Sequence, residues 1–172
     1  ELLQNRSFEQ TIPDGWRVCH GNLCQTSDCV YSGSFAAAIT NTGSVTSWIY
    51  QLVPVSPGGT CIFSGWAIKN DPKIKKVYLQ LAFLNGEGES ILRCTSTEEL
   101  TSDDSSYRFL TIGPRIAPDE VVSARVMAVV EPASGDSATA DYDAVSFIAG
   151  TTSYTYANCR THSDCCPNPY AN

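Results

Sequence analysis

The sequence predicts an all-β fold, specifically an antiparallel two-sheet jelly-roll β-sandwich. Many short segments rich in β-branched and aromatic residues follow one another, with turn signals between them at fairly even spacing. No segment longer than about ten residues carries an apolar stripe of helical period. A third observation, an even number of cysteines (eight), predicts that the sandwich is disulfide-braced.

Each strand is expected between two turn signals. The run from Trp48 to Val55 ends at a Ser-Pro-Gly-Gly turn, the next run ends at Asn70-Asp71-Pro72, and the third at an Asn-Gly-Glu-Gly turn. The region 16–34, with three cysteines, is interpreted as a strand interrupted by a disulfide-tied loop. The other strands are expected at 35–40, 48–55, 61–68, 76–84, 91–95, 107–113, 121–131 and 139–148. Eight or nine strands in two antiparallel sheets follow.

The predicted strand 76–84 has two different faces, because side chains alternate along a strand. One face is apolar and suited to a core. The other mixes polar and aromatic side chains. The first set is Val77, Leu79, Leu81 and Phe83, and the second is Tyr78, Gln80, Ala82 and Leu84.

Composition predicts one globular domain over 1–150, followed by a cysteine-rich tail over 151–172. The net charge of −7 and the isoelectric point near 4.7 oppose binding to nucleic acid or anionic lipid. The longest apolar runs, such as 126–130, are far shorter than the roughly 20 residues that cross a bilayer, so no membrane span is expected.

The cysteines predict a secreted, extracellular protein. Cytosolic glutathione would keep the thiols reduced, and zinc sites usually need Cys-x-x-Cys pairs, which this sequence lacks. The absence of an initiator methionine also favours export. The disulfide connectivity stays open. The tail is expected either to be linked by a disulfide to one of the first three cysteines or to form a small cystine-rich appendage. The eight are Cys19, Cys24, Cys29, Cys61, Cys94, Cys159, Cys165 and Cys166.

The order of several local patterns between residues 2 and 149 resembles the jelly-roll carbohydrate-binding modules that recognise cellulose, xylan or β-glucans, within the galactose-binding-like superfamily. The cysteine-rich loop and the tail lie outside that pattern. The patterns are Leu-Leu-Gln-Asn-Arg-Ser-Phe-Glu at 2–9, Gly-Trp at 15–16, Tyr-Ser-Gly-Ser-Phe-Ala-Ala at 31–37, Trp48, Ser-Pro-Gly at 56–58, Phe-Ser-Gly-Trp-Ala at 63–67 and Asp-Tyr-Asp-Ala-Val-Ser-Phe at 141–147.

This resemblance implies a structural calcium ion (Ca²⁺) that ties the first strand to the last. Its ligands would be Glu9, Asp143 and backbone carbonyls between Ser32 and Ser34, because calcium binds six to eight hard oxygens. The sequence departs from the family where a second aspartate commonly follows the first, since Ala144 stands there, and Asp141 is the available substitute. On the alternative interpretation these acids are ordinary surface carboxylates.

The resemblance also implies a carbohydrate-binding surface of aromatic rings and a few polar groups. Trp48 matches a binding tryptophan of the family, and Tyr78 shares a strand face with Gln80. Glu131 matches a binding acid of the xylan-specific branch. Trp16 and Trp66 match core aromatics, and a core position is the alternative for Trp48 too. The expected partner is a polysaccharide or glycan.

Catalysis is not expected. The two histidines, His20 and His162, lie in cysteine-rich irregular segments, and the acid pairs at 98–99 and 103–104 are typical of a solvated loop. Asn5-Arg6-Ser7 is an acceptor pattern for N-glycosylation, which makes Asn5 a candidate glycoprotein site.

The rival hypothesis is a structural subunit of an extracellular filament, sheath or matrix. It would self-assemble through exposed strand edges or through the tail 151–172, using the same sandwich as a building block.

Overall fold

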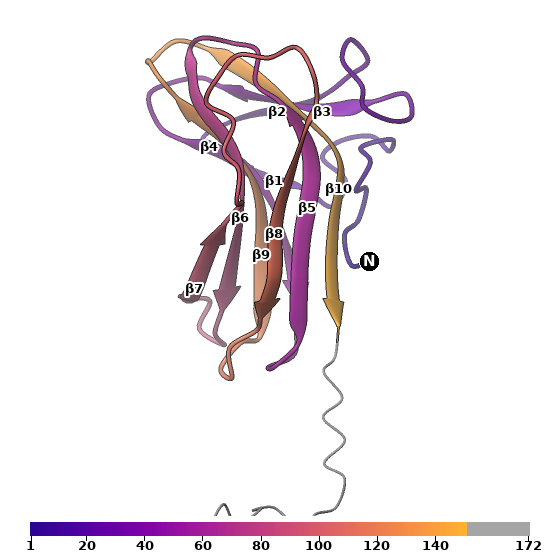
Figure 1. The fold of residues 1–172 in the computed structure, drawn as a ribbon, viewed down its shortest axis with the longest axis vertical. Coiled ribbons are helices and arrows are strands. Elements are labelled where there is room, and N and C mark those ends of the chain that lie inside the picture. Colours follow the sequence, from indigo (N-terminus) through magenta and orange to yellow (C-terminus); the bar gives the residue numbers. More distant parts are fainter. Residues whose placement is uncertain (151–172) are drawn as a thin grey trace, which may run out of the picture.

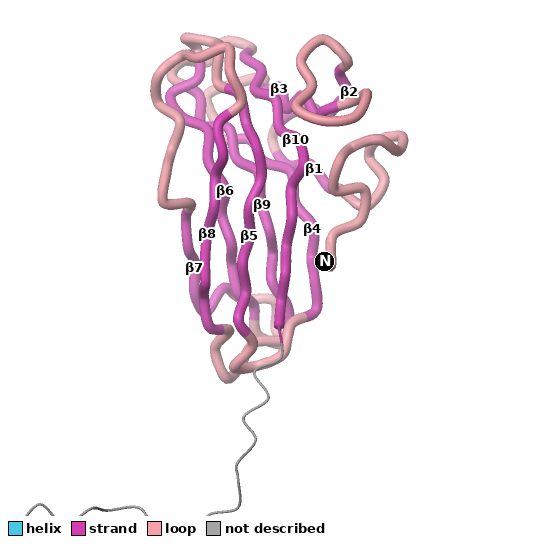
Figure 2. Tube along the Cα trace, turned by 45° about the vertical axis from the view of Figure 1, so that its right-hand side comes forward, coloured by secondary structure: helices cyan, strands magenta, loops and turns pink. Residues whose placement is uncertain are grey.

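The computed structural model describes residues 1–150, and these residues form ten β-strands and no helix. The strands run mostly along the long axis of the molecule and lie in two layers (Figures 1 and 2). They are β1 (Arg17–Cys19), β2 (Gly21–Thr26), β3 (Ala36–Asn41), β4 (Ser47–Pro54), β5 (Thr60–Ile68), β6 (Ile74–Leu84), β7 (Ser90–Thr95), β8 (Arg108–Ile116), β9 (Ser123–Pro132) and β10 (Ala138–Gly150).

The strands form two five-stranded antiparallel sheets. Sheet A has the order β1-β4-β9-β6-β7, and sheet B has the order β2-β3-β10-β5-β8. The eight strands expected from residue 35 onward are all present, with ends that differ from the predictions by a few residues. The prediction of an all-β, two-sheet sandwich is therefore confirmed.

The cysteine-rich region 16–34 contains two short strands instead of one interrupted strand. β1 pairs with β4 in sheet A, whereas β2 pairs with β3 in sheet B, so the chain changes sheet between them. His20 makes this step in the left-handed conformation, with a φ of 55°. Gly21 follows, where a Cβ atom would lie 2.6 Å from the carbonyl oxygen of Thr40. Only glycine fits this close approach.

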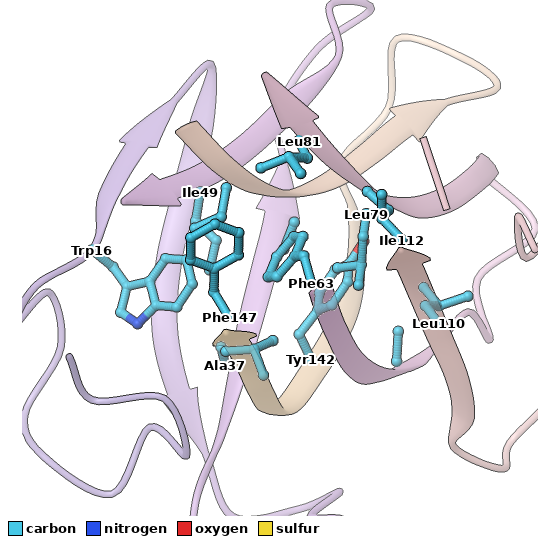
Figure 3. Close-up of a cluster of buried hydrophobic side chains, with 14 of the residues drawn as sticks. Trp16, Ala37, Ile49, Phe63, Leu79, Leu81, Leu110, Ile112, Tyr142 and Phe147 are labelled. Atoms are coloured by element: carbon cyan, nitrogen blue, oxygen red, sulfur yellow. The ribbon is translucent and has the colours of Figure 1, made fainter. Parts of the chain in front are cut away.

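The core lies between the inner faces of the sheets (Figure 3). The face of β6 that was predicted to be apolar is fully buried, with Leu79 and Leu81 opposite Phe63 and Phe147 of sheet B. Trp16 is 2% exposed and packs on Phe8 at 5.4 Å between ring centroids, as predicted for a core aromatic.

One hydrogen-bonded link crosses this core. Tyr142 of β10 is fully buried and extends its hydroxyl to the backbone of sheet A. The hydroxyl accepts the N–H of Val129 at 3.1 Å and donates toward the carbonyl oxygens of Val129 and Tyr78, at 2.7 and 3.0 Å. The link meets β9 and β6 directly beneath the outer face of sheet A.

The described residues contain no disulfide, since Cys19, Cys24, Cys29, Cys61 and Cys94 are free thiols. Packing and strand pairing hold residues 1–150 together in this structure. The tail cysteines lie outside the described residues, so bracing through them stays a prediction. No helix in residues 1–150 is long and apolar enough to span a membrane.

Candidate functional site

The four residues predicted to bind sugar lie together on the outer face of sheet A. Trp48 is on β4, Tyr78 and Gln80 are on β6, and Glu131 is on β9. Strand pairing places Val129 of β9 in one row between Trp48 and Tyr78. Because neighbouring strands are about 4.8 Å apart, the Cα atoms of these two aromatic residues lie roughly 10 Å apart on one surface.

The aromatic rings on this face rest on an apolar floor. Trp48, Tyr50 and Tyr78 are half-buried and pack on a second apolar cluster, distinct from the core between the sheets. The buried members of that cluster are Ala82, Leu84, Met127 and Val129. A ring that is already held by its neighbours loses little conformational entropy when a ligand stacks on it.

The polar ends of these side chains have no partner in the described part of the chain. The side chains of Trp48, Tyr50, Tyr78 and Gln80 form no hydrogen bond with any other residue of 1–150. Burial raises the pKa of the Tyr78 hydroxyl, so this group is protonated at neutral pH and can donate. The face therefore offers flat apolar surface together with unused donors and acceptors, the combination that saccharide recognition requires.

Charged groups border this face on the β6–β9 side. Glu131 Oε1 accepts a hydrogen bond from Lys75 Nζ at 2.7 Å, and Lys76 Nζ lies 3.6 Å from the other carboxylate oxygen. The bond from Lys75 holds the pKa of Glu131 below its usual range, so the carboxylate is ionised at neutral pH. Lys76 also pairs with Glu99 at 3.1 Å and lies 4.7 Å from the centroid of the Tyr78 ring.

Arg125 belongs to the same face and was missed at the sequence level. Its guanidinium lies 5.5 Å from the centroid of the Tyr50 ring, and its buried Nε has no hydrogen-bond partner in residues 1–150. The side of β9 on which Arg125 lies could have been predicted from period-two alternation, because Arg125, Met127 and Glu131 share one side of that strand. Only the cross-strand register, however, brings Arg125 next to the β4 aromatics.

The edge strand β1 adds two further groups to this face. Arg17 is opposite Tyr50, and Cys19 is opposite Trp48. His20, which follows β1, meets Trp48 edge-on with ring centroids 5.3 Å apart. No sequence signal predicted this contact, because it depends on the change of sheet at His20.

The predicted calcium ligands Glu9 and Asp143 come from opposite ends of the described chain and converge on the loop between β2 and β3. In the structure both carboxylates accept backbone N–H groups of this loop. The donors are Tyr31 and Ser32, at 3.0 and 2.8 Å from Asp143, and Ser34 and Phe35, at 3.0 and 3.1 Å from Glu9.

The charge of this acid pair is not balanced by a cation in residues 1–150. Neither Glu9 nor Asp143 pairs with a lysine, arginine or histidine there. Burial, and to a smaller extent Glu9, raises the pKa of Asp143. No group of three or more acidic, histidine or cysteine side chains that could hold a metal occurs in the described residues, so any cation here would need backbone oxygens too. Two neighbouring acids without a cationic partner fit that arrangement.

Asp141 is on the same side of β10 as Asp143, one outward position earlier, and accepts no hydrogen bond from the loop. It lines a hollow of about 230 Å³ together with Cys29, Ile68, Asn70, Ser105 and Thr139. Burial, and then the charge of Asp28, raises the pKa of Asp141 to about 6. Ala144 follows Asp143 directly, at the position where carbohydrate-binding modules of the resembled family commonly have a second aspartate. It adopts a φ of 47° at a bulge in β10.

The raised pKa of Asp141 predicts a pH-dependent stability. Because the folded state binds this proton more tightly than the unfolded state, stability falls as the pH rises from about 4 to about 6. The groups around Asp141 are Asp28, Cys29 and Tyr107.

Replacing Asp141 by asparagine removes the charge that destabilises the fold at high pH. Asp141→Asn should raise Tm at pH 8 by roughly 2–4 °C, for a screened effect of about 1 kcal/mol, and leave Tm at pH 4 unchanged. Thermal melts at both pH values check this, with Asp119→Asn in an exposed loop as the control. A gain at pH 4 equal to that at pH 8 would contradict it.

The core position predicted for Trp66 is wrong. Trp66 is half-buried on the outer face of sheet B, where Tyr31 stacks on it with ring centroids 4.1 Å apart and an interplanar angle of 16°. Phe109 of β8 lies 5.2 Å from Trp66, and Tyr107 meets Tyr31 edge-on at 5.6 Å. The sandwich thus has an aromatic cluster on each outer face.

The adjacent acids of the loop after β7 line a hollow of about 300 Å³, and each of them pairs with a cation. The pairs are Lys69–Asp103, Lys76–Glu99 at 3.1 Å, Arg108–Glu98 at 3.5 Å and Arg108–Asp104 at 3.8 Å. This pairing agrees with the interpretation of these acids as a charged loop.

The candidate acceptor Asn5 is half-buried, and its side-chain amide both donates to and accepts from the backbone of Gln10, each at 3.0 Å. Its glycosylation stays a prediction.

No known protein family matches the sequence, and no curated protein matches it either. Solved structures do match the fold. The xylan-binding CBM22-1 domain of Paenibacillus barcinonensis Xyn10C has a TM-score of 0.64 and 14% identity, over 85% of this chain and 92% of that domain. The family 22 carbohydrate-binding module of Clostridium thermocellum Xyn10B has a TM-score of 0.64 and 16% identity, over 86% and 92%.

Two further matches differ in how much of the other protein they cover. TmCBM61, solved with β-1,4-galactotriose, has a TM-score of 0.58 and 19% identity, over 86% of this chain and 97% of that one. The enzymatically active domain of tailspike protein 4 of bacteriophage CBA120 has a TM-score of 0.66 and 14% identity, but this chain spans only 21% of it. The resemblance to carbohydrate-binding β-sandwich modules is therefore confirmed for the fold. Of the four structures described, the three that are matched over nearly their whole length are carbohydrate-binding modules.

Proposed function

We propose that this chain is a non-catalytic carbohydrate-binding module that holds a polysaccharide on the outer face of sheet A. The observation that carries the proposal is the meeting of Trp48, Tyr78 and Gln80 on one face, with their polar ends free of partners in residues 1–150. The chemistry follows from the contacts. Pyranose rings stack on the aromatic faces, while amide, hydroxyl and guanidinium groups bind the sugar hydroxyls.

The ligand class we propose is a neutral, β-linked polysaccharide such as xylan or galactan. Proteins of the same fold bind xylan and β-1,4-galactotriose. Glu131 is neutralised by two lysines, whereas Arg17 and Arg125 pair with no acid in residues 1–150. These residues therefore offer no unpaired carboxylate to a cationic sugar.

A polysaccharide retention assay tests this proposal. The purified chain should be depleted from solution by insoluble xylan or galactan, and a Tyr78→Ala/Gln80→Ala double variant should not. The control is Val122→Ala, an exposed residue that follows the β8–β9 turn and belongs to neither outer face. Retention of the double variant equal to that of the control would contradict the proposed face. Absence of binding together with large particles by light scattering would favour a structural subunit instead.

We also propose that a structural calcium ion binds at Glu9 and Asp143, with backbone oxygens of the loop at Ser32 and Ser34 as further ligands. Support comes from the convergence of the two carboxylates from distant parts of the chain and from the lack of a cationic side chain beside them. A bound divalent cation would supply that missing charge and tie the N-terminal segment to β10.

Calcium binding should raise Tm, because a ligand that binds only the folded state stabilises it. At a calcium concentration 100 times Kd, the gain is about 2.7 kcal/mol, or roughly 5–10 °C for a domain of this size. Thermal melts with calcium and with a chelator measure it. Asp143→Asn should remove the response, whereas Asp136→Asn on an exposed loop should keep it. An unchanged Tm in the native chain would contradict the calcium site.

We propose further that the protein is secreted and that its cysteines form disulfides in which the tail cysteines take part. Cys24 is exposed and Cys19 and Cys29 are half-buried, so these three are accessible to a partner, whereas Cys61 is buried in the core. Mass spectrometry of the native protein after thiol alkylation would count the free thiols. Eight alkylated cysteines in protein from an oxidising compartment would contradict it.

A further inference from the structure

The outer face of sheet B carries a second set of groups that the proposed function does not use. It combines the aromatic cluster of Tyr31, Trp66 and Phe109 with the hollow that contains Asp141. Strand pairing joins the two features. Asp141 is opposite Ile68, which lines the hollow. Asp143, at the next outward position of β10, is opposite Trp66.

The aromatic part is open to solvent. Tyr31 is 44% exposed and Phe109 is 46% exposed, although both are large apolar side chains. Trp66 lies beneath Tyr31 and beside Phe109, so it supports both rings. The loop that carries Tyr31 is held by the hydrogen bond from its own N–H to Asp143. The rings are therefore fixed in place before any ligand arrives.

The polar part contains a carboxylate without a protein partner. The side chain of Asp141 forms no hydrogen bond or ion pair within residues 1–150, and the side chains of Asn70 and Ser105 beside it form none either. Asp141 is half-buried on β10 and lines the wall of the hollow beside Asn70 and Ser105. A carboxylate in such a position points to a ligand that donates hydrogen bonds.

We infer that the outer face of sheet B is a second saccharide-binding site, in which a neutral sugar ring stacks on Tyr31 or Phe109 and its hydroxyls bind Asp141 and Asn70. The site goes beyond the proposed function, and it does not depend on sheet A. Asp28 and Asp141 make the surroundings negative, which excludes an anionic sugar. A hollow of about 230 Å³ with a carboxylate and an amide suits a hydroxyl-bearing ring better than the side chains of a protein partner.

Two sites on opposite faces would let one chain bridge two polysaccharide strands. This consequence rests on the proposed function as well. It predicts that the native chain cross-links a soluble polysaccharide and increases its turbidity or viscosity, while a chain with either face disabled still binds but does not cross-link.

Calorimetry on protein in which sheet A has been disabled tests the site itself. Xylohexaose and β-1,4-galactotriose, used as separate probes, should still bind to the Trp48→Ala protein at one site. Adding Phe109→Ala or Asp141→Asn to that background should weaken the remaining binding at least tenfold. Adding Ile148→Ala, an exposed apolar residue further along β10, should leave it unchanged. Thermal melts confirm that each variant is folded.

The outcomes separate this site from the proposed function. If the Trp48→Ala protein binds neither probe while the native chain binds one molecule, the second site is overturned and the proposed function stands. If Trp48→Ala has no effect and Phe109→Ala removes binding, the second site stands and the proposed face is wrong. If Phe109→Ala only converts a dimer into a monomer in sedimentation, the face is a self-association surface and the second site is overturned.

Discussion

Replacing Trp48 by alanine should weaken polysaccharide binding about 30-fold or more, which corresponds to a loss of about 2 kcal/mol. Trp48 has the largest ring on the outer face of sheet A. It packs on the apolar cluster that includes its cross-strand neighbour Val129, and its indole N–H has no partner in residues 1–150. Truncation removes the stacking surface and one hydrogen-bond donor together. Isothermal titration of the native chain and the variant with soluble xylan or galactan measures the ratio of the two Kd values.

The free energy of unfolding provides the control for this prediction. Trp48 is half-buried and lies outside the core between the sheets, so its loss should cost the fold much less than the loss of a core aromatic. Trp48→Phe keeps a smaller ring and should recover part of the affinity. Equal affinity in the native chain and the alanine variant would show that this ring does not contact the ligand.

Replacing Tyr142 by alanine should lower the free energy of unfolding by about 4–6 kcal/mol. The side chain is fully buried among the aromatics of the core, and its hydroxyl is bonded to the backbone of two strands of sheet A. The change leaves a large cavity and removes the hydrogen-bonded link between the sheets. Denaturant unfolding monitored by circular dichroism measures the loss.

Tyr142→Phe separates the two contributions, because it keeps the ring and removes only the hydroxyl. We expect a loss of about 1–2 kcal/mol for this change. The matched control is Tyr50→Phe, which removes a hydroxyl that has no hydrogen bond in the described residues and should change stability by less than about 0.5 kcal/mol. Equal stability losses for the two phenylalanine variants would contradict the role of the link.

Period-two alternation was enough to predict the sandwich and the direction of its strand faces. It placed Tyr78 and Gln80 opposite Leu79 and Leu81, and the structure has them so. The same rule, applied to β5, places Trp66 on the face opposite to Phe63, since the two are three positions apart. Family resemblance overrode that signal and gave the wrong position for Trp66.

The remaining features depend on register and on irregular backbone, which local patterns do not encode. Arg125 reaches Tyr50 only through the pairing of β4 with β9, and Tyr31 reaches Trp66 only through the course of the β2–β3 loop. The convergence of Glu9 and Asp143 was implied by resemblance alone. The number of cysteines predicted disulfides, but the five cysteines in residues 1–150 form none among themselves. Disulfide formation depends on the distances between cysteines in the fold, which their spacing in the sequence does not determine.

Carbohydrate binding on the outer face of sheet A can be followed through the three tryptophan indole N–H resonances in a ¹⁵N NMR titration with xylohexaose or β-1,4-galactotriose. Each tryptophan reports on a different place, because Trp48 lies on the outer face of sheet A, Trp66 on that of sheet B, and Trp16 in the core. Sugar binding on the outer face of sheet A should give a saturable shift of the Trp48 resonance and leave the Trp16 resonance unmoved. A Trp48 resonance that stays in place while the protein binds either saccharide would contradict it.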